Sequence, residues 1–190
     1  YGKWRIRVKD NESGMVYERI VNLDTIPVKM STIILGDPQI ENKPNTEVID
    51  FENITYSTIQ KIPNGVGGLN WSNLIVTDNL LYGGEGYKNI TMSGKYVGYN
   101  TSGYPVTISN ENGFDFYGGY FGVAWMDSAE GEILKVRVWR ENQLISEEEY
   151  SLSALGPFWF DANYKNTTKL EISTEHYWQF VVDDILIGIH

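Results

Sequence analysis

The feature that most constrains the fold of this chain is its alternation of apolar and polar residues, since no segment shows a convincing helical period. In residues 3–9, Trp4, Ile6 and Val8 fall on one face of an extended strand and basic side chains fall on the other. A turn-forming run at 10–14 follows, and 15–23 has the pattern of a returning strand. The chain is therefore predicted to begin with a β-hairpin.

The remainder of the chain has the same character, with short strands separated by turns. Further strands are predicted at 29–35, 47–52, 72–77, 89–99, 105–109, 120–126, 133–140, 144–152, 157–161, 168–173 and 178–187. The breaks contain turn-forming residues, namely Pro63-Asn64-Gly65, Gly67-Gly68, Gly83-Gly84, Asn112-Gly113, Gly118-Gly119 and Gly156-Pro157. Short strands at this spacing predict an all-β fold, an antiparallel β-sandwich of jelly-roll-like type with an additional N-terminal β-hairpin.

A polar segment at 36–46 (GDPQIENKPNT) is the predicted linker. It separates an N-terminal part, residues 1–35, from a β-sandwich domain at 47–190. The first hairpin and the segment 135–157 are both charged hairpins followed by a proline. This similarity indicates either that residues 1–35 are the end of a preceding, related repeat or only that two charged hairpins look alike.

Aromatic residues are more numerous than a core of this size needs, with 13 Tyr and 6 Trp among 190 residues. Glycines beside several tyrosines would let ring and backbone approach a ligand closely, while phenol and amide groups bond to hydroxyls. The alternative is that these rings cover an edge of the sandwich, and Trp71 fits either a corner of the fold or a ligand platform. The candidate ligand-binding residues are Trp71, Tyr82, Tyr87, Tyr96, Tyr99, Asn100, Tyr104, Tyr117 and Tyr120.

Three other tryptophans are interpreted from the alternation. Trp125 and Trp178 continue apolar faces and are predicted to face the core. Trp139 shares its face with Lys135 and Arg137, so it is the tryptophan predicted to be exposed.

Charge and motifs exclude several classes of function. The formal net charge of −10 at pH 7 argues against nucleic-acid binding, which needs clustered Lys and Arg, and no apolar run is long enough to insert into a membrane. There is no Cys, so thiol catalysis and thiolate metal sites are excluded. No hydrolase elbow, zinc-protease motif or phosphate loop occurs, and His176 has the surroundings of a surface residue. We therefore predict no enzymatic activity, while noting that the carboxylate pair of a glycosidase has no sequence signature.

Several short segments, in this order, resemble secreted microbial and fungal modules. They are 49–52 (IDFE), 62–73 (IPNGVGGLNWSN), 114–116 (FDF), 120–125 (YFGVAW) and 180–185 (FVVDDI). The opening DFE and closing VDDI also resemble jelly-roll carbohydrate-binding modules and the MAM type of adhesion domain. The resemblance covers about residues 48–187 and implies a β-sandwich whose first and last strands pair.

That resemblance also implies a structural Ca²⁺ held by acidic residues near the two ends of the domain. The residues it designates are Asp50, Glu52, Asp183 and Asp184. Ca²⁺ prefers six to eight oxygen ligands, and adjacent acids at a strand end repel each other unless a cation or solvent separates them. The alternative is that Asp183-Asp184 forms a polar turn and Asp50 caps a strand.

Asn-X-Ser/Thr triplets favour an extracellular, secreted or cell-surface location. They occur at Asn11, Asn53, Asn70, Asn89, Asn100 and Asn166, although a chain rich in these residues also contains such triplets by chance. Two functions follow from the sequence. One is a non-catalytic carbohydrate- or glycan-binding module with a structural calcium site; the other is a structural repeat of an adhesin, layer or filament, packed against copies of itself.

Overall fold

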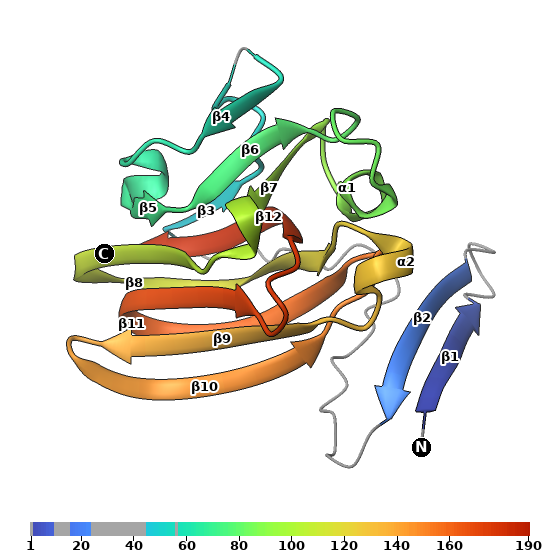
Figure 1. Cartoon of the computed structure of the whole chain (residues 1–190). Helices are drawn as coiled ribbons and strands as arrows, with labels where there is room; N and C mark the ends of the chain where they lie inside the picture. Colours follow the sequence, from blue (N-terminus) through green and yellow to red (C-terminus); the bar gives the residue numbers. More distant parts are fainter. Residues whose placement is uncertain (1, 10–15, 24–44, 56) are drawn as a thin grey trace.

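The computed structural model describes residues 2–9, 16–23, 45–55 and 57–190, the first two ranges by their backbone alone. The described elements are mostly strands, with a few short helices between them (Figure 1). The elements are β1 (Gly2–Lys9), β2 (Val16–Leu23), β3 (Thr46–Ile49), β4 (Ile59–Lys61), η1 (Val66–Gly68), β5 (Asn70–Ser72), β6 (Leu74–Asp78), α1 (Glu85–Ile90), β7 (Tyr96–Asn100), η2 (Thr101–Gly103), β8 (Val106–Val123), α2 (Met126–Ala129), β9 (Ile133–Arg140), β10 (Gln143–Ser151), β11 (Phe158–Thr174) and β12 (Phe180–Ile189).

The strands form two sheets, and all pairs are antiparallel. β1 and β2 pair with each other as a two-stranded sheet. The other strands form a ten-stranded sheet with the order β10-β9-β11-β8-β12-β7-β6-β4, to which β3 is added at β12 and β5 at β8. The predicted all-β antiparallel sandwich with an additional N-terminal hairpin is therefore confirmed.

One core lies between the strands of the two opposite edges of the ten-stranded sheet. Leu74 and Val76 of β6 belong to the same buried cluster as Val136 and Val138 of β9, although the two strands are far apart in the strand order. Their side chains can meet only if the sheet folds over, so that its inner faces lie against each other as two layers. The rings of Phe121, Phe158, Phe160 and Phe180 fill part of this core.

The long strands β8 and β11 differ from the prediction, which placed turns at Asn112-Gly113 and Gly118-Gly119. β8 continues through both pairs and stays paired with β11, with register shifts that mark β-bulges. Gly113 and Gly118 have φ values of 86° and 153°, which glycine adopts without strain. A bulge and a turn need the same residues, and the sequence did not distinguish the two.

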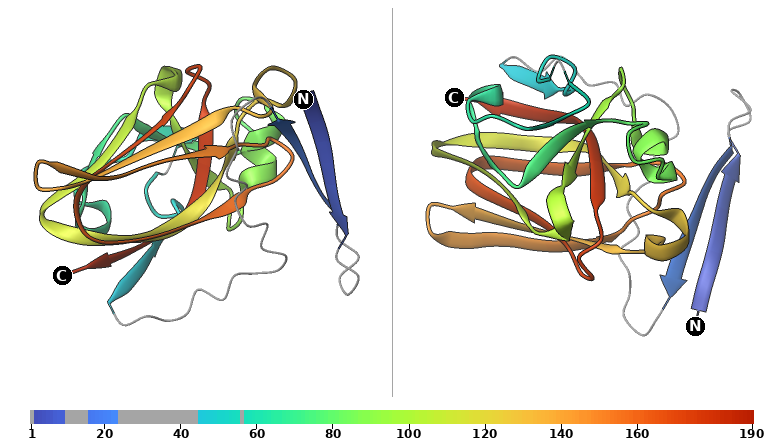
Figure 2. Two further views of the ribbon diagram at one scale, coloured as in Figure 1. Left: turned by 90° about the horizontal axis from the view of Figure 1, so that it is seen from below. Right: turned by 45° about the horizontal axis from the view of Figure 1, so that its top comes forward.

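The helix α1 is a second difference, because the prediction made 89–99 a strand. Tyr87 and Ile90 are three residues apart on one face of α1, and both are fully buried. The Gly86 amide donates to the Ala124 carbonyl (3.0 Å), and a Cβ on Gly86 would lie 1.9 Å from the Val123 carbonyl oxygen. The helix therefore packs directly on β8 and β12 (Figure 2).

The first and last strands of the sandwich pair, as the resemblance implied. β3 pairs with β12, with Ile49 opposite Ile185. The division at residues 36–46 stays a prediction, and the expected strand at 29–35 and turn at 10–14 lie outside the described residues. None of the helices in the described ranges has the length and apolar character needed to cross a bilayer.

Candidate functional site

A second, smaller apolar cluster lies on the opposite side of the sheet from the main core. Residues alternate along β7 and β12, so Tyr96 and Val182 face the main core while Val97 and Val181 face the second cluster. The helix α1 covers this cluster. Its buried members are Tyr87, Ile90, Val97, Tyr99, Ala124 and Val181, with Ile75 and Trp125 partly buried against them.

Tyr82 lies at the surface of this cluster and connects it to solvent. Its ring contacts those of Tyr87 (centroids 5.4 Å apart) and Tyr99 (5.7 Å, nearly perpendicular), and the hydroxyls of Tyr82 and Tyr99 are 2.9 Å apart. Two causes raise the pKa of Tyr99 above its ordinary value: burial, which is the larger, and the neighbouring Tyr82 hydroxyl. The three rings contact one another and form a group of which Tyr82 is the exposed member.

Gln179 joins this group to the loop between β11 and β12. Its Oε1 accepts hydrogen bonds from the Tyr87 hydroxyl (3.0 Å) and the Trp125 Nε1 (3.1 Å). Both donors therefore fix the orientation of the amide. Its Nε2 has no hydrogen-bond partner in the described part of the chain, which makes it a positioned donor for a ligand at the half-buried Gln179.

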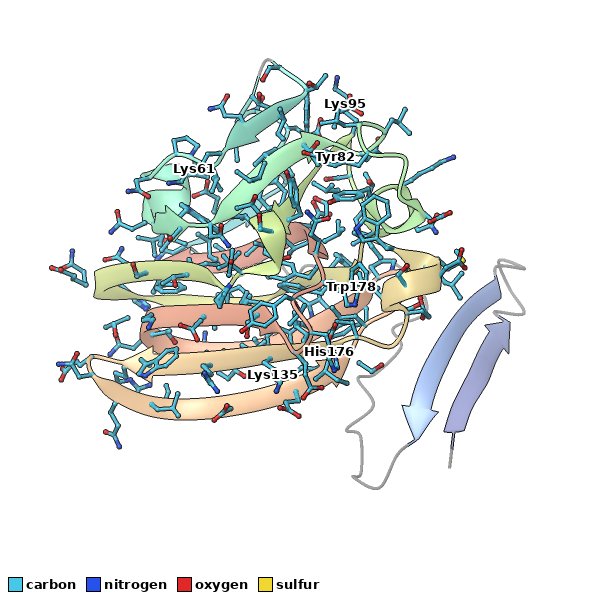
Figure 3. The ribbon with its side chains drawn as sticks, in the orientation of Figure 1. Lys61, Tyr82, Lys95, Lys135, His176 and Trp178 are labelled. Carbon is cyan, nitrogen blue, oxygen red and sulfur yellow. The ribbon has the colours of Figure 1, made fainter. Side chains whose placement is uncertain are left out.

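The adjoining loop carries two further rings, Tyr177 and Trp178, next to a third, Tyr104, which follows η2. The rings of Tyr104 and Tyr177 have centroids 6.1 Å apart at 72°, and Trp178 follows in the chain. Tyr82, Tyr104, Tyr177 and Trp178 are 40%, 59%, 65% and 36% exposed, respectively. We call these four the ring surface. Figure 3 shows Trp178 near His176 in the middle of the view and Tyr82 above them, near Lys95.

Asn100 connects the backbones that carry these rings. It is completely buried; its Oδ1 accepts from the Phe180 amide (2.7 Å) and its Nδ2 donates to the Tyr104 carbonyl (3.2 Å). Asn100 was predicted to contact a ligand, and its burial corrects that prediction. It fixes the start of β12 relative to the segment after η2 instead.

The predicted ligand residues thus divide into two groups. The structure brings Tyr82, Tyr87, Tyr99 and Tyr104 to the ring surface or directly behind it. It places the other tyrosines and Trp71 elsewhere, all largely buried. Trp71 is a corner residue whose Nε1 donates to the Val66 carbonyl, Tyr96 faces the core, Tyr117 donates to Asp115, and the Tyr120 ring packs on Trp159.

The sequence did not identify three residues of this site, Tyr177, Trp178 and Gln179. Trp178 was predicted to face the core as part of a strand, but β12 begins only at Phe180, so the alternation does not extend to it. Trp125 is only half-buried, between the two clusters. Trp139 is partly covered, with the Lys169 Nζ 4.1 Å from its ring centroid. The one available signal was the polar run before Tyr177, which is typical of a loop.

The four acidic residues assigned to calcium bind protein donors. Glu52 Oε1 accepts from the amides of Lys95 and Tyr96 (both 2.7 Å), and Asp183 Oδ2 accepts from those of Met92 and Ser93. Asp184 accepts from the Ser93 hydroxyl, and Asp50 from the Glu52 amide. The bonds to Glu52, Asp183 and Asp184 hold the turn before β7, and the Asp50 bond is local to the segment after β3. Within the described ranges no three acidic or histidine side chains are grouped to hold a metal, and the calcium ion stays a prediction.

Burial, followed by the neighbouring Asp184, raises the pKa of Asp183 to about 8. Three backbone amides donate to this carboxyl and act in the opposite direction. Asp183 therefore serves as an internal anchor of the turn.

The asparagines of the glycosylation triplets differ in exposure. Asn53, Asn70, Asn89 and Asn166 are exposed, whereas Asn11 lies outside the described residues. Asn100 is buried with both ends of its amide hydrogen-bonded, so the folded chain has no room for a glycan there and this part of the prediction is corrected.

No protein-family model matches the sequence, and a search of curated proteins found no match. Solved structures similar to this chain contain carbohydrate-binding modules. They include the CBM22-1–GH10 modules of Clostridium thermocellum xylanase 10B complexed with xylohexaose (14% identity, 64% of this chain and 25% of that chain, TM-score 0.38). The CBM22-1–CBM22-2 tandem of Paenibacillus barcinonensis Xyn10C is 14% identical, with 86% of this chain and 46% of that chain covered and a TM-score of 0.39. The M60 catalytic domain of Clostridium perfringens ZmpB with its CBM51 domains is 14% identical, with 98% of this chain and 18% of that chain covered and a TM-score of 0.36. The chain thus spans less than half the length of each, and at these TM-scores its function has to be argued from its own residues.

Proposed function

We propose that this chain is an extracellular, non-catalytic module that binds glycan chains through the ring surface. The observation that carries the proposal is the exposure of Tyr82, Tyr104, Tyr177 and Trp178 on backbones held in place by buried hydrogen bonds. Exposed aromatic area of this kind is unfavourable in water, so its presence in a group indicates a partner. The exposed triplets at Asn53 and Asn166 support the extracellular location.

The chemistry of the ring surface suits sugars. The axial hydrogens of a pyranose form an apolar face that stacks on an aromatic ring, and its hydroxyls bond to phenols and amides. Tyr82, Tyr104 and Tyr177 supply both kinds of contact, and the Gln179 Nε2 supplies a donor beside them. All of these side chains are uncharged. Glycoside hydrolysis needs two carboxyl groups on either side of the bond, so the arrangement favours binding without cleavage.

The angles between the rings indicate the physical form of the glycan. The exposed rings of Tyr104 and Tyr177 meet at 72°. Rings that are nearly perpendicular cannot all lie against one flat surface. We therefore propose a single soluble chain as the ligand, rather than the face of a crystalline polysaccharide.

The test compares binding to soluble xylan, mixed-linkage β-glucan and galactomannan with binding to microcrystalline cellulose, by calorimetry and sedimentation. Trp178→Ala is expected to weaken binding to the preferred soluble polysaccharide about tenfold, which corresponds to about 1.4 kcal/mol. Trp139→Ala is the matched control, because Trp139 is another partly exposed tryptophan. It lies six residues along β9 from Ile133, whose carbonyl accepts from the Glu175 amide beside the loop that carries Tyr177 and Trp178, so Trp139 is about 20 Å along the strand from that loop. Absence of binding to all three soluble polysaccharides, or equal weakening by Trp139→Ala, would refute the proposal.

A further inference from the structure

The loop that carries Tyr177 and Trp178 has an unusual backbone. Tyr177 has φ 61°, in the left-handed region that a bulky residue rarely adopts. Its carbonyl oxygen lies 1.6 Å from the position of a Cβ on Gly103, so only glycine at 103 allows the approach. Such a conformation persists only where surrounding groups impose it, and it is found at binding and catalytic sites. The groups that hold the loop are therefore functionally informative.

Glu132 is the group beneath this loop. It lies between α2 and β9, and its side chain is only 1% exposed. Its Oε1 accepts from the backbone amides of Glu175 (3.2 Å) and His176 (3.3 Å) and lies 3.2 Å from the His176 Nδ1. It also accepts from the Ile133 amide (2.7 Å). One carboxylate oxygen thus connects the turn before β9 to the first two residues of the ring-bearing loop.

The other oxygen of Glu132 is buried and without a hydrogen-bond partner among the described residues. Burying a carboxylate with one unpartnered oxygen is unfavourable, so stability alone does not account for a glutamate at this position. A glutamine would accept the same amide hydrogens through its oxygen and would avoid burying a charge. Replacing Glu132 with glutamine would therefore remove the charge while keeping the oxygen that accepts the amide hydrogens.

We propose that Glu132 is a positioning residue of the ring surface, which holds residues 175–178 in the conformation that exposes Tyr177 and Trp178. The effect on binding rests on the proposed function, whereas the positioning of the loop rests on the contacts of Glu132 alone. Thr174 completes the set of anchors, since its hydroxyl donates to the Trp178 carbonyl (2.6 Å). Glu132 contacts the loop only through backbone amides and the His176 ring, so it acts through the loop and does not touch the ligand.

Glu130 provides a matched control within the same turn. It is also a glutamate with one buried oxygen, Oε1, that lacks a partner in the described part of the chain. Its Oε2 accepts from the Ala154 amide (2.7 Å), which belongs to the connection between β10 and β11. Glu130→Ala therefore removes a buried glutamate and its one amide bond two residues away without altering the ring-bearing loop.

The test combines amide hydrogen exchange with binding to whichever of the three soluble polysaccharides the unmodified chain binds best. In the unmodified chain the His176 amide should exchange slowly for an exposed loop, and Glu132→Ala should accelerate it. The same substitution should weaken binding about tenfold or more, because only the fraction of molecules with the ordered loop is competent to bind. Glu132→Gln should restore both properties, and Glu130→Ala should leave both within about twofold of the unmodified chain.

The outcomes separate this inference from the proposed function. A His176 amide that exchanges as fast as free loop amides in the unmodified chain overturns the inference, even if Glu132→Ala does not fold. Equal weakening of binding by Glu130→Ala also overturns it. If no polysaccharide binds, the proposed function fails, while slow exchange at His176 that Glu132→Ala abolishes and Glu132→Gln retains still establishes the positioning role.

Discussion

Replacing Asn100 with alanine should destabilise the fold by an amount that can be worked out from its contacts. The Phe180 amide, which is completely buried, loses its acceptor at 2.7 Å. The Tyr104 carbonyl loses a donor but keeps the Asn73 Nδ2 at 2.8 Å, so it is not left unpaired. A buried amide left without an acceptor lowers the free energy of unfolding by about 1–3 kcal/mol, and the small cavity left by the side chain lowers it further. We expect a loss of about 2–3 kcal/mol in the free energy of unfolding.

The measurement is urea denaturation followed by tryptophan fluorescence, with Asn110→Ala as the control. Asn110 also makes two hydrogen bonds, from its Nδ2 to the Gly68 carbonyl and from the Asn112 amide to its Oδ1, but both lie at the surface. Water replaces such bonds, so the control should change stability by no more than about 0.5 kcal/mol. Equal losses for the two variants would refute the assignment of Asn100 as a buried clamp.

Two further predictions concern charged groups. Burial acts to raise the pKa of Asp115, but bonds from the Asn166 amide, the Lys165 ammonium and His190 lower it to about 2 from the ordinary 3.8. The contribution of Asp115 to the free energy of unfolding is therefore present above about pH 4 and lost as the pH falls through about 2. This contribution amounts to about 2 kcal/mol. Asp115→Asn should remove this part of the acid dependence, measured by urea titrations between pH 2 and 6. An unchanged acid dependence in that variant would contradict this. The proposed calcium ion at the paired first and last strands predicts a melting temperature several degrees lower in EDTA than in Ca²⁺, and identical melting curves would reject the ion.

The fold class was predictable because alternation reports directly on which face of a strand is buried. Strand β9 follows this rule closely, with Leu134, Val136 and Val138 buried and the residues between them more exposed. The rule failed where glycine had two uses: Gly113 and Gly118 form bulges within β8, although each was interpreted as part of a turn. It also failed at α1, whose six residues are too few for a helical period to be visible.

The candidate site was predictable only in part, since composition showed an excess of rings but not where each ring points. Tyr82 and Tyr104 were identified from their glycine-rich or turn-rich surroundings, and both are exposed. Tyr177 and Trp178 were missed because their exposure depends on where β12 begins and on contacts with Gly103 and Glu132, which are distant in the sequence. Tertiary contacts of this kind leave no local pattern.

The loop between β11 and β12 has several anchors on its backbone, besides the side-chain bonds of Gln179 and His176. Glu132 accepts from its amides, Thr174 donates to the Trp178 carbonyl, and Gly103 accommodates the Tyr177 carbonyl. None of these anchors depends on the side chains at 177 and 178. The side chain at 178 can therefore be varied in a combinatorial library while these anchors are kept, and position 177 admits residues that tolerate its positive φ. Selection from such a library would retarget the module without redesigning its scaffold.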